Sequence, residues 1–335
     1  MEETLRQLQE AMQAHRQAMA GVNPVDADAD IAAPPSIAHD ARDVAVQLLA
    51  RDIERVSGIE ISGMMEAKLG RVLASAPLPM LQAWVDRLHL LPPDDAEWLS
   101  LIESLTVHET FFHRDRSQLD LLRRRLLPEL IAAAARNGTC RLRFWSAGCA
   151  TGEEAYTLAI VGLLALRDAG FAREEANGGI GCLAPWTIEV LGSDISRQVL
   201  ARAVVATYPS EELGAFRNLP DDMNQFFPAL RRRKGAAEVE LRGIHDGVRR
   251  HVRFGWFNLM AEEPPVGNCD IVLCRNVLIY LTSAARAKAL SVLRRALLPG
   301  GYLMLGPTDA LTEKPRYDAC WDEGAVAYQL KRGHG

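Results

Sequence analysis

The stretch WSAGCATGEE at residues 145–154 decides the fold, because it predicts a glycine turn between a strand and a helix. The strand is RLRFWS at 141–146, and the helix is expected to start at about Glu154. Glycines in such a turn let the backbone bend tightly and come close to a ligand. We therefore expect the first strand and the first helix of an α/β domain here, with a ligand site at the turn.

Three later stretches are also predicted as strands, at 186–192, 270–274 and 302–306. Helical segments lie between them, and strands that alternate with helices predict a mostly parallel, doubly wound Rossmann-like sheet. Ligands of such sheets bind at the carboxyl ends of the strands. Polar residues that directly follow a strand are therefore the candidate site residues.

The residues after the second glycine of the turn discriminate between ligand classes. A phosphate-binding loop has a lysine there, whereas Gly152 is followed by Glu153 and Glu154, which would repel a triphosphate. A dinucleotide site needs a third glycine, and the same charge objection applies. S-adenosylmethionine has no phosphate and carries a sulfonium and an ammonium, which a carboxylate such as Glu153 attracts. The alternative is that both glutamates only favour the helix dipole at its first turn.

Two other strand ends carry polar residues. Asp194 follows the strand at 186–192, where an acid can bind both ribose hydroxyls, and a helix N-cap is its alternative role. Arg275, Asn276 and Tyr280 follow the strand at 270–274 and are expected to face the ligand crevice. For Asn276 taken alone, a turn or cap is the alternative. Together with the glycine turn, Asp194 favours a nucleoside ligand.

The length of 335 residues predicts two domains. Residues 1–40 are expected to contain a short amphipathic helix at 4–20 followed by a linker rich in Pro, Asp and Ala. Apolar residues at three- and four-residue spacing predict a small helical domain at 41–105. Residues 106–335 are then the α/β domain.

Two segments depart from the strand–helix alternation. At 236–257, alternating residues on both sides of Asp246 and Gly247 predict an antiparallel hairpin inserted into the α/β domain as a β-subdomain. The glycine-rich run at 170–185 is expected to loop out between the glycine turn and Asp194.

Composition excludes several classes of protein. The formal net charge is −5, so nothing global indicates nucleic-acid binding. No apolar run reaches the roughly 20 residues of a membrane-spanning helix. The acidic, polar start of the chain is unlike a signal peptide, so a cytoplasmic location is expected. The 6 cysteines form no C-x-x-C pair, so no metal site and no disulfide framework is expected.

At this point the chain resembles the CheR-type chemotaxis receptor glutamate O-methyltransferases, over about residues 45–330. The resemblance rests on TVHETFFHR at 106–114, the glycine turn, Asp194, the Asn258-Leu259 pair and CRNVLIY at 274–280. It implies that S-adenosylmethionine is the cofactor and S-adenosylhomocysteine the product. Matched by position, the cofactor contacts that it implies are His108, Thr110, Arg114, Glu153, Asp194, Asn258, Leu259, Arg275 and Asn276. It also places Arg114 and Tyr280 near the methyl group as the catalytic residues.

This chain departs from the family pattern at three places. His108 stands where the family usually has Asn, which affects one cofactor hydrogen bond, although imidazole still donates or accepts. His113 stands where Phe is common, and GPTD at 306–309 replaces the usual G-H-S-E.

The function that the resemblance implies is methyl transfer to glutamate side chains of methyl-accepting chemotaxis receptors, giving methyl esters in receptor adaptation. A glutamate carboxylate is already ionised at neutral pH, so no strong general base is required. We expect a monomer whose partners are the receptors, with Lys68, Arg71 and Arg87 as a docking face or, alternatively, a solvated basic face. The inserted hairpin resembles the subdomain with which some members bind a receptor tether peptide. Competing hypotheses are a cofactor sensor without catalysis and a methyltransferase for another substrate.

Overall fold

The computed structural model describes residues 37–333, except 75, 107, 177, 212–213 and 235–236. The chain forms two compact units, Met1–Leu105 and Thr106–Gly335, and each is described separately here. The predicted helix at 4–20 and most of the predicted linker lie outside the described residues. Residues 37–40, which we expected in the linker, already belong to a helix.

The described part of the N-terminal unit consists of helices. They are α2 (Ile37–Ser57), α3 (Met64–Leu73), α4 (Leu78–Leu90) and α5 (Ala96–Leu105). Leu49 and Ile53 lie one helical turn apart and are both fully buried, because residues at this spacing share one face of a helix. Asp95 Oδ1 accepts a hydrogen bond from the Glu97 backbone N–H at 2.9 Å, so an aspartate after the Pro92-Pro93 break caps α5.

The basic residues expected to form a docking face have different surroundings. Arg87 forms an ion pair with Glu97, and Lys68 Nζ donates to the Ser104 carbonyl at 2.7 Å. Arg71 donates to a carbonyl of its own helix at 3.3 Å and is exposed. Two of these side chains therefore contribute to the fold of the unit itself.

The second unit is built on a seven-stranded sheet of order β11-β12-β10-β9-β1-β4-β8. The strands are β1 (Arg141–Ala147), β4 (Thr187–Asp194), β8 (Val252–Trp256), β9 (Cys269–Cys274), β10 (Leu297–Leu305), β11 (Tyr317–Asp322) and β12 (Ala325–Leu330). The strands from β10 to β8 are parallel, and β11 and β12 add an antiparallel edge. The predicted doubly wound α/β sheet is confirmed.

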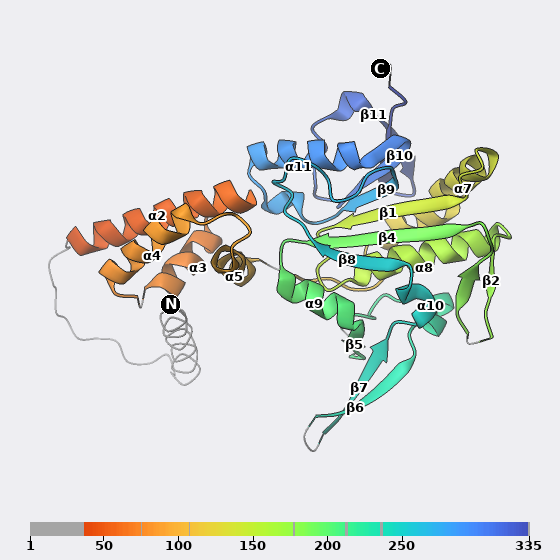
Figure 1. Cartoon of the computed structure of the whole chain (residues 1–335), viewed down its shortest axis with the longest axis horizontal. Coiled ribbons are helices and arrows are strands. Elements are labelled where there is room, and N and C mark those ends of the chain that lie inside the picture. Colours follow the sequence, from red (N-terminus) through yellow and green to blue (C-terminus); the bar gives the residue numbers. More distant parts are fainter. Residues whose placement is uncertain are drawn as a thin grey trace. The chain divides into compact units, whose positions relative to one another are not determined.

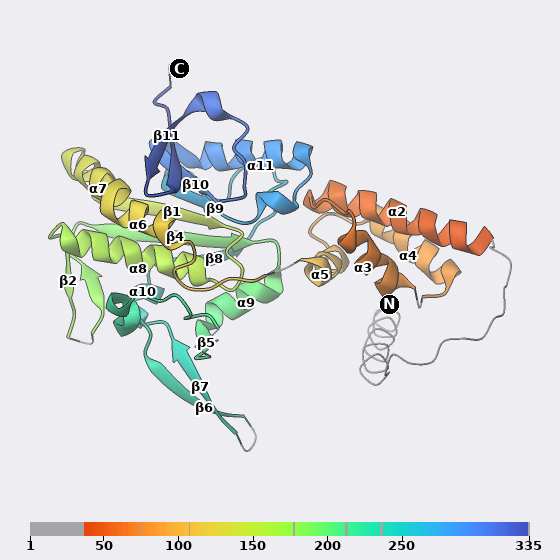
Figure 2. The same cartoon turned by 180° about the vertical axis from the view of Figure 1, so that it is seen from behind.

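Helices cover both faces of this sheet. They are α6 (Arg116–Leu121), the π-helical η1 (Leu122–Leu126), α7 (Leu127–Arg136), α8 (Glu153–Asp168), α9 (Arg197–Val205) and α11 (Ser283–Ala296). Figures 1 and 2 show α11 on one face and α7 and α8 on the other. Nearly every residue of α8 is buried, because this helix packs between the sheet and the elements around it.

The hairpin predicted at 236–257 is wrong in its pairing. Strand β7 (Ala237–Gly243) pairs with β6 (Ala229–Lys234) and β5 (Thr207–Pro209), whereas β8 joins the main sheet beside β4. The Asp-Gly pair starts the short helix α10 (Asp246–Arg249), which His245 caps by accepting the Gly247 N–H at 3.0 Å. The small antiparallel unit therefore lies before Asp246. The run at 170–185 forms the hairpin of β2 (Ala172–Glu174) and β3 (Ile180–Cys182).

Candidate functional site

The glycine turn after β1 brings the backbone close to two neighbouring strand ends. The N–H groups of Gly148 and Cys149 donate to the Ser193 carbonyl at 2.8 and 2.9 Å, which ties the end of β1 to the end of β4. Gly148 has φ +80°, and a Cβ at this position would collide with Val277 Cγ2 after β9. Gly152, with φ +94°, is the N-cap of α8. The turn therefore depends on glycine at both positions, because other residues rarely adopt such φ values.

Asp194 lies at the carboxyl end of β4 and is 6% exposed. Its two carboxylate oxygens accept one backbone N–H each, from Ala150 and from Ser196, both at 2.9 Å. Burial raises the pKa of Asp194, and these two hydrogen bonds oppose that rise. The N-cap of α9 is Ser196, so the alternative role of Asp194 as the cap is not the one found. Each carboxylate oxygen retains acceptor capacity for a hydroxyl group.

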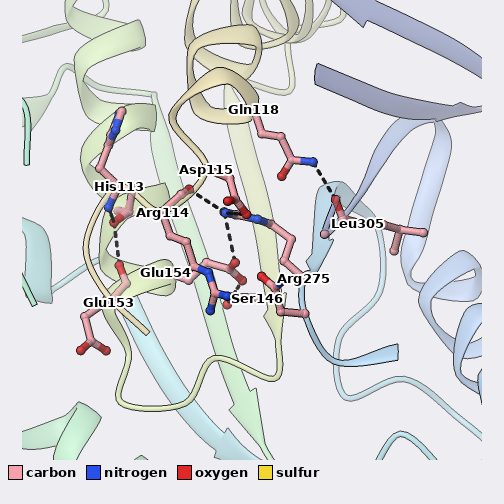
Figure 3. A network of polar contacts seen from close by, with 12 residues as sticks. His113, Arg114, Asp115, Gln118, Ser146, Glu153, Glu154, Arg275 and Leu305 are labelled. Carbon is pink, nitrogen blue, oxygen red and sulfur yellow. Dashed lines mark hydrogen bonds and ion pairs between the residues drawn. The ribbon is translucent and has the colours of Figure 1, made fainter. Parts of the chain in front are cut away.

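The two adjacent glutamates of the turn have different environments. Glu153 is 4% exposed, and burial raises its pKa to about 7, opposed mainly by the hydrogen bond from Thr151 Oγ1 at 2.7 Å. Within the described part of the chain, no Lys or Arg forms an ion pair with it. Glu154 instead accepts from Ser146 Oγ at 2.6 Å and faces Arg275 at 3.4 Å. Figure 3 shows the Glu153 carboxylate pointing away from Glu154, Ser146 and Arg275, so Glu153 remains available for a cationic ligand.

The segment after β9 is held by a carboxylate that sequence analysis had not assigned. Asp309 Oδ2 accepts the backbone N–H groups of Asn276 at 2.8 Å and Gly306 at 3.0 Å, and Oδ1 accepts that of Ile279 at 3.0 Å. The signal in the sequence was the GPTD turn after β10, which we had noted only as a departure from the family pattern. Asn276 has φ +58°, and its side-chain oxygen is buried without a partner among the described residues. An orphaned buried acceptor of this kind fits a ligand that donates a hydrogen bond.

The two predicted catalytic residues lie on different segments. Arg114 donates to the Glu109 carbonyl at 2.9 Å, and its guanidinium lies 5.7 Å from the centre of the Phe111 ring. No described carboxylate forms an ion pair with it. Tyr280 ends the short helix Leu278–Tyr280 after β9 and is 40% exposed. The guanidinium of Arg275 contacts protein groups, so a cofactor contact of this residue stays a prediction.

His108 precedes Arg114 in the chain and lies near Asp194, the predicted ribose-binding acid. Its Nε2 is 2.8 Å from Thr106 Oγ1. Its positive charge, when protonated, lowers the pKa of Asp194, although burial remains the larger influence on that pKa. A histidine in place of the usual Asn is therefore close enough to act on the same part of the site.

Asn258 and Leu259 follow the end of β8. Asn258 is 7% exposed, and its side-chain oxygen accepts the Met260 N–H at 2.9 Å. The Phe257 N–H donates to the Asp194 carbonyl at 3.0 Å, which joins this strand end to that of β4. The strands β9, β1, β4 and β8 are neighbours in the sheet. The residues that follow their carboxyl ends therefore lie along the same side of the sheet, and they include Asn276, Glu153, Asp194 and Asn258.

A cavity of about 630 Å³ opens beside this edge. Thr110, Thr151 and Glu153 line it, together with residues of α9 and β5. Two of the predicted cofactor contacts, Thr110 and Glu153, therefore face open space.

These residues fit S-adenosylmethionine. The Glu153 carboxylate can bind the ammonium or the sulfonium, and Asp194 can accept from the ribose hydroxyls. The orphaned acceptor of Asn276 can offer another polar contact. The described residues hold no group of three or more His, Cys, Asp and Glu placed to bind a metal ion, and none of their helices is both long and apolar enough to cross a membrane.

Residues 108–323 match the family model described as "CheR methyltransferase, SAM binding domain". The chain belongs to this family. Its cofactor is S-adenosylmethionine, and it is an S-adenosylmethionine-dependent methyltransferase. The expected resemblance is confirmed, while the roles of the individual site residues remain proposals.

Relatives of the chain match it over most of their length. Chemotaxis protein methyltransferase 1 of Pseudomonas aeruginosa is 29% identical over 83% of this chain and 95% of the relative. Chemotaxis protein methyltransferase Cher2 of Pseudomonas putida is 27% identical over 80% of this chain and 90% of the relative. A chemotaxis protein methyltransferase of Vibrio anguillarum is 31% identical over 70% of this chain and 76% of the relative.

Proposed function

We propose that this chain methylates glutamate side chains on the cytoplasmic region of chemotaxis receptors, giving methyl esters. The observation that carries the proposal is the division of charge at the site. Among the described residues, the buried carboxylate of Glu153 forms no ion pair with Lys or Arg, and the Arg114 guanidinium forms none with a carboxylate. A positively charged cofactor and a negatively charged substrate can therefore bind side by side.

The chemistry requires little from the protein beyond alignment. S-adenosylmethionine supplies a methyl group on a sulfonium, which a carboxylate oxygen can displace in line. The substrate carboxylate has an ordinary pKa of about 4.3 and is ionised at neutral pH, so no protein base has to remove a proton. Holding the two reactants in line can contribute about 7–11 kcal/mol in favourable cases.

We propose that Arg114 and Tyr280 hold the substrate carboxylate. The Arg114 guanidinium is held by a neutral carbonyl and an aromatic ring, so its charge is not neutralised within the described chain. Tyr280 is 40% exposed, so a receptor side chain can reach it. Both contacts must be loose enough to let the carboxylate attack, because tight pairing would stabilise the ground state.

This function also implies a location, an oligomeric state and the kind of partner. We propose that the protein is a cytoplasmic monomer that meets the receptors by transient contacts and binds no nucleic acid. The three-stranded sheet leaves β6 as an edge strand, which supports strand addition by a receptor tether peptide.

The test combines full-length protein, radiolabelled S-adenosylmethionine and membranes that contain chemotaxis receptors of the same organism. The expected result is label in receptor glutamates that mild base releases as methanol. Asp194→Asn is the negative control, because it weakens the cofactor site. Cofactor binding without base-labile incorporation would favour the sensor hypothesis, and label in a small molecule or in nucleic acid would favour a different substrate. Either result would overturn the proposal.

A further inference from the structure

The segment that carries Arg114 has an unusual backbone. Both its neighbours, His113 and Asp115, are non-glycine residues in the left-handed region, with φ +58° and +57°. Residues other than glycine adopt this conformation rarely, so surrounding contacts must hold it in place. The Arg114 side chain itself is held only by the Glu109 carbonyl and the Phe111 ring among the described contacts. The position of its guanidinium therefore depends on the backbone.

Two side chains contact this backbone: Thr157 Oγ1 accepts the His113 N–H at 3.3 Å, and Arg275 makes the shorter contacts. One terminal nitrogen donates both to the Arg114 carbonyl at 2.6 Å and to Asp115 Oδ2 at 2.7 Å. The other terminal nitrogen faces Glu154 Oε2 at 3.4 Å. The Arg275 side chain is only 2% exposed. Figure 3 shows these contacts converging on one guanidinium.

The cluster joins three separate segments of the chain. Asp115 precedes α6, Glu154 lies in the first turn of α8, and Arg275 directly follows β9. Ser146 Oγ on β1 donates to Glu154 at 2.6 Å and so ties the cluster to the sheet. Because Arg275 is buried with two carboxylates, its charge is used within the fold.

The same contacts connect the two proposed catalytic residues. Arg275 begins the segment that leads to Tyr280, and its guanidinium bonds to the carbonyl of Arg114. Among the described residues, the printed hydrogen bonds that join residues 113–115 to residues 275–280 are those of the Arg275 side chain. A displacement of about 1 Å between groups that must hold one carboxylate can lower a rate by about 100-fold.

We propose that Arg275 is a positioning residue that sets Arg114 relative to Tyr280, and that its side chain acts through the Arg114 backbone rather than by binding the cofactor. This inference rests on the proposed function in one respect, since it assigns Arg114 and Tyr280 to the substrate carboxylate. Arginine makes these contacts with two nitrogens that point in different directions, one toward the Arg114 carbonyl and Asp115 and the other toward Glu154, whereas lysine has a single nitrogen and cannot reproduce both.

The first test compares Arg275→Lys with a matched control, Arg143→Lys. Arg143 also pairs with a glutamate, Glu189 at 2.8 Å, and donates to the Gly267 carbonyl at 3.0 Å, but it lies in the first half of β1, away from the glycine turn. For Arg275→Lys we expect kcat to fall by about 100-fold, with the calorimetric Kd for S-adenosylmethionine within about threefold of the wild type. Arg143→Lys should keep the wild-type kcat. A cofactor Kd that weakens in parallel with kcat would overturn the proposal.

The second test asks whether the effect passes through Arg114. In an Arg114→Lys background, Arg275→Lys should cause little further loss of kcat, because the group that it positions is already absent. Full additivity of the two losses would contradict the proposal.

A third measurement needs no substrate. Hydrogen exchange of the peptide around residues 113–118 should become faster in Arg275→Lys and stay unchanged in Arg143→Lys. Unchanged exchange in both variants would remove the positioning role even if receptor methylation is observed. Conversely, a wild-type protein that methylates no receptor would refute the proposed function, while the exchange result would still test the positioning role of Arg275.

Discussion

Glu153→Gln should make the protein more stable at neutral pH and weaken its binding of the cofactor. Glutamine has nearly the same shape and can still accept the hydrogen bond from Thr151 Oγ1, which is 2.7 Å long in the structure. It lacks the negative charge, whose burial without a described cationic partner raises the pKa of Glu153 from its ordinary 4.5 to about 7. The substitution thus removes a charge that the folded protein tolerates only at a cost.

The size of the effect follows from the two pKa values. One pH unit between them corresponds to about 1.36 kcal/mol, so a rise from 4.5 to about 7 corresponds to about 3 kcal/mol. The folded state binds the proton more tightly than the unfolded state, so this group destabilises the fold as pH rises. The loss of stability begins near pH 4.5 and is complete above about pH 7. In Glu153→Gln, this part of the pH dependence should disappear.

The assay is denaturant unfolding of the wild type and Glu153→Gln, without cofactor, at intervals from pH 5 to pH 8. The two proteins should differ most at pH 8, with Glu153→Gln more stable by up to about 3 kcal/mol, and should converge toward pH 5. Glu154→Gln is the contrasting variant. It leaves Arg275 with one fewer buried partner, so it should destabilise the fold.

Calorimetry supplies the other half of the prediction. Loss of a charge-assisted hydrogen bond of about 1.5–3 kcal/mol should weaken S-adenosylmethionine binding by about 10- to 100-fold. Because the cation binds the ionised carboxylate, wild-type affinity should rise with pH up to about 7, and binding should release protons. A Glu153→Gln protein that is less stable than the wild type at pH 8, or that binds the cofactor equally well, would refute the reasoning.

Three other variants test the remaining parts of the site. Tyr280→Phe should lower kcat by about 10- to 100-fold with little change in cofactor Kd, and unchanged kcat would remove Tyr280 from the mechanism. Gly148→Ala should destabilise the protein by about 1–3 kcal/mol in denaturant unfolding, because φ +80° is strained for alanine and its Cβ would collide with Val277; wild-type stability would show that the turn adapts. Asp194→Asn should weaken binding of both the cofactor and S-adenosylhomocysteine by about 10-fold or more, since both carry the ribose, and an effect on only one of them would speak against ribose binding.

Local patterns in the chain are sufficient for much of this fold. The strands around β1, β4, β9 and β10 are short apolar runs, and the helices of the N-terminal unit follow three- and four-residue spacing. The glycine turn could be predicted because Gly148 and Gly152 need φ values that few other residues adopt. Asp194 could be located because polar residues that directly follow parallel strands meet at one edge of the sheet.

Roles that depend on contacts between distant segments could not be predicted in this way. The Asp246-Gly247 dipeptide is compatible both with a hairpin turn and with the start of α10. Which of the two forms depends on whether the following strand, β8, pairs with β4. Ser196 rather than Asp194 caps α9, which depends on the turn of the backbone after β4.

Residue types and their spacing along the chain are enough to predict alternating strands and helices, a glycine turn and an acidic site for a charged nucleoside, because each of these patterns lies within a short stretch of sequence. Adjacent Glu153 and Glu154 look alike in the printed letters, yet successive residues of a helix point about 100° apart. Folding therefore directs one carboxylate toward the cavity and the other toward Arg275, which follows the distant strand β9. Burial and charge pairing between remote segments exist only once the chain has folded, and they assign the two glutamates to different tasks.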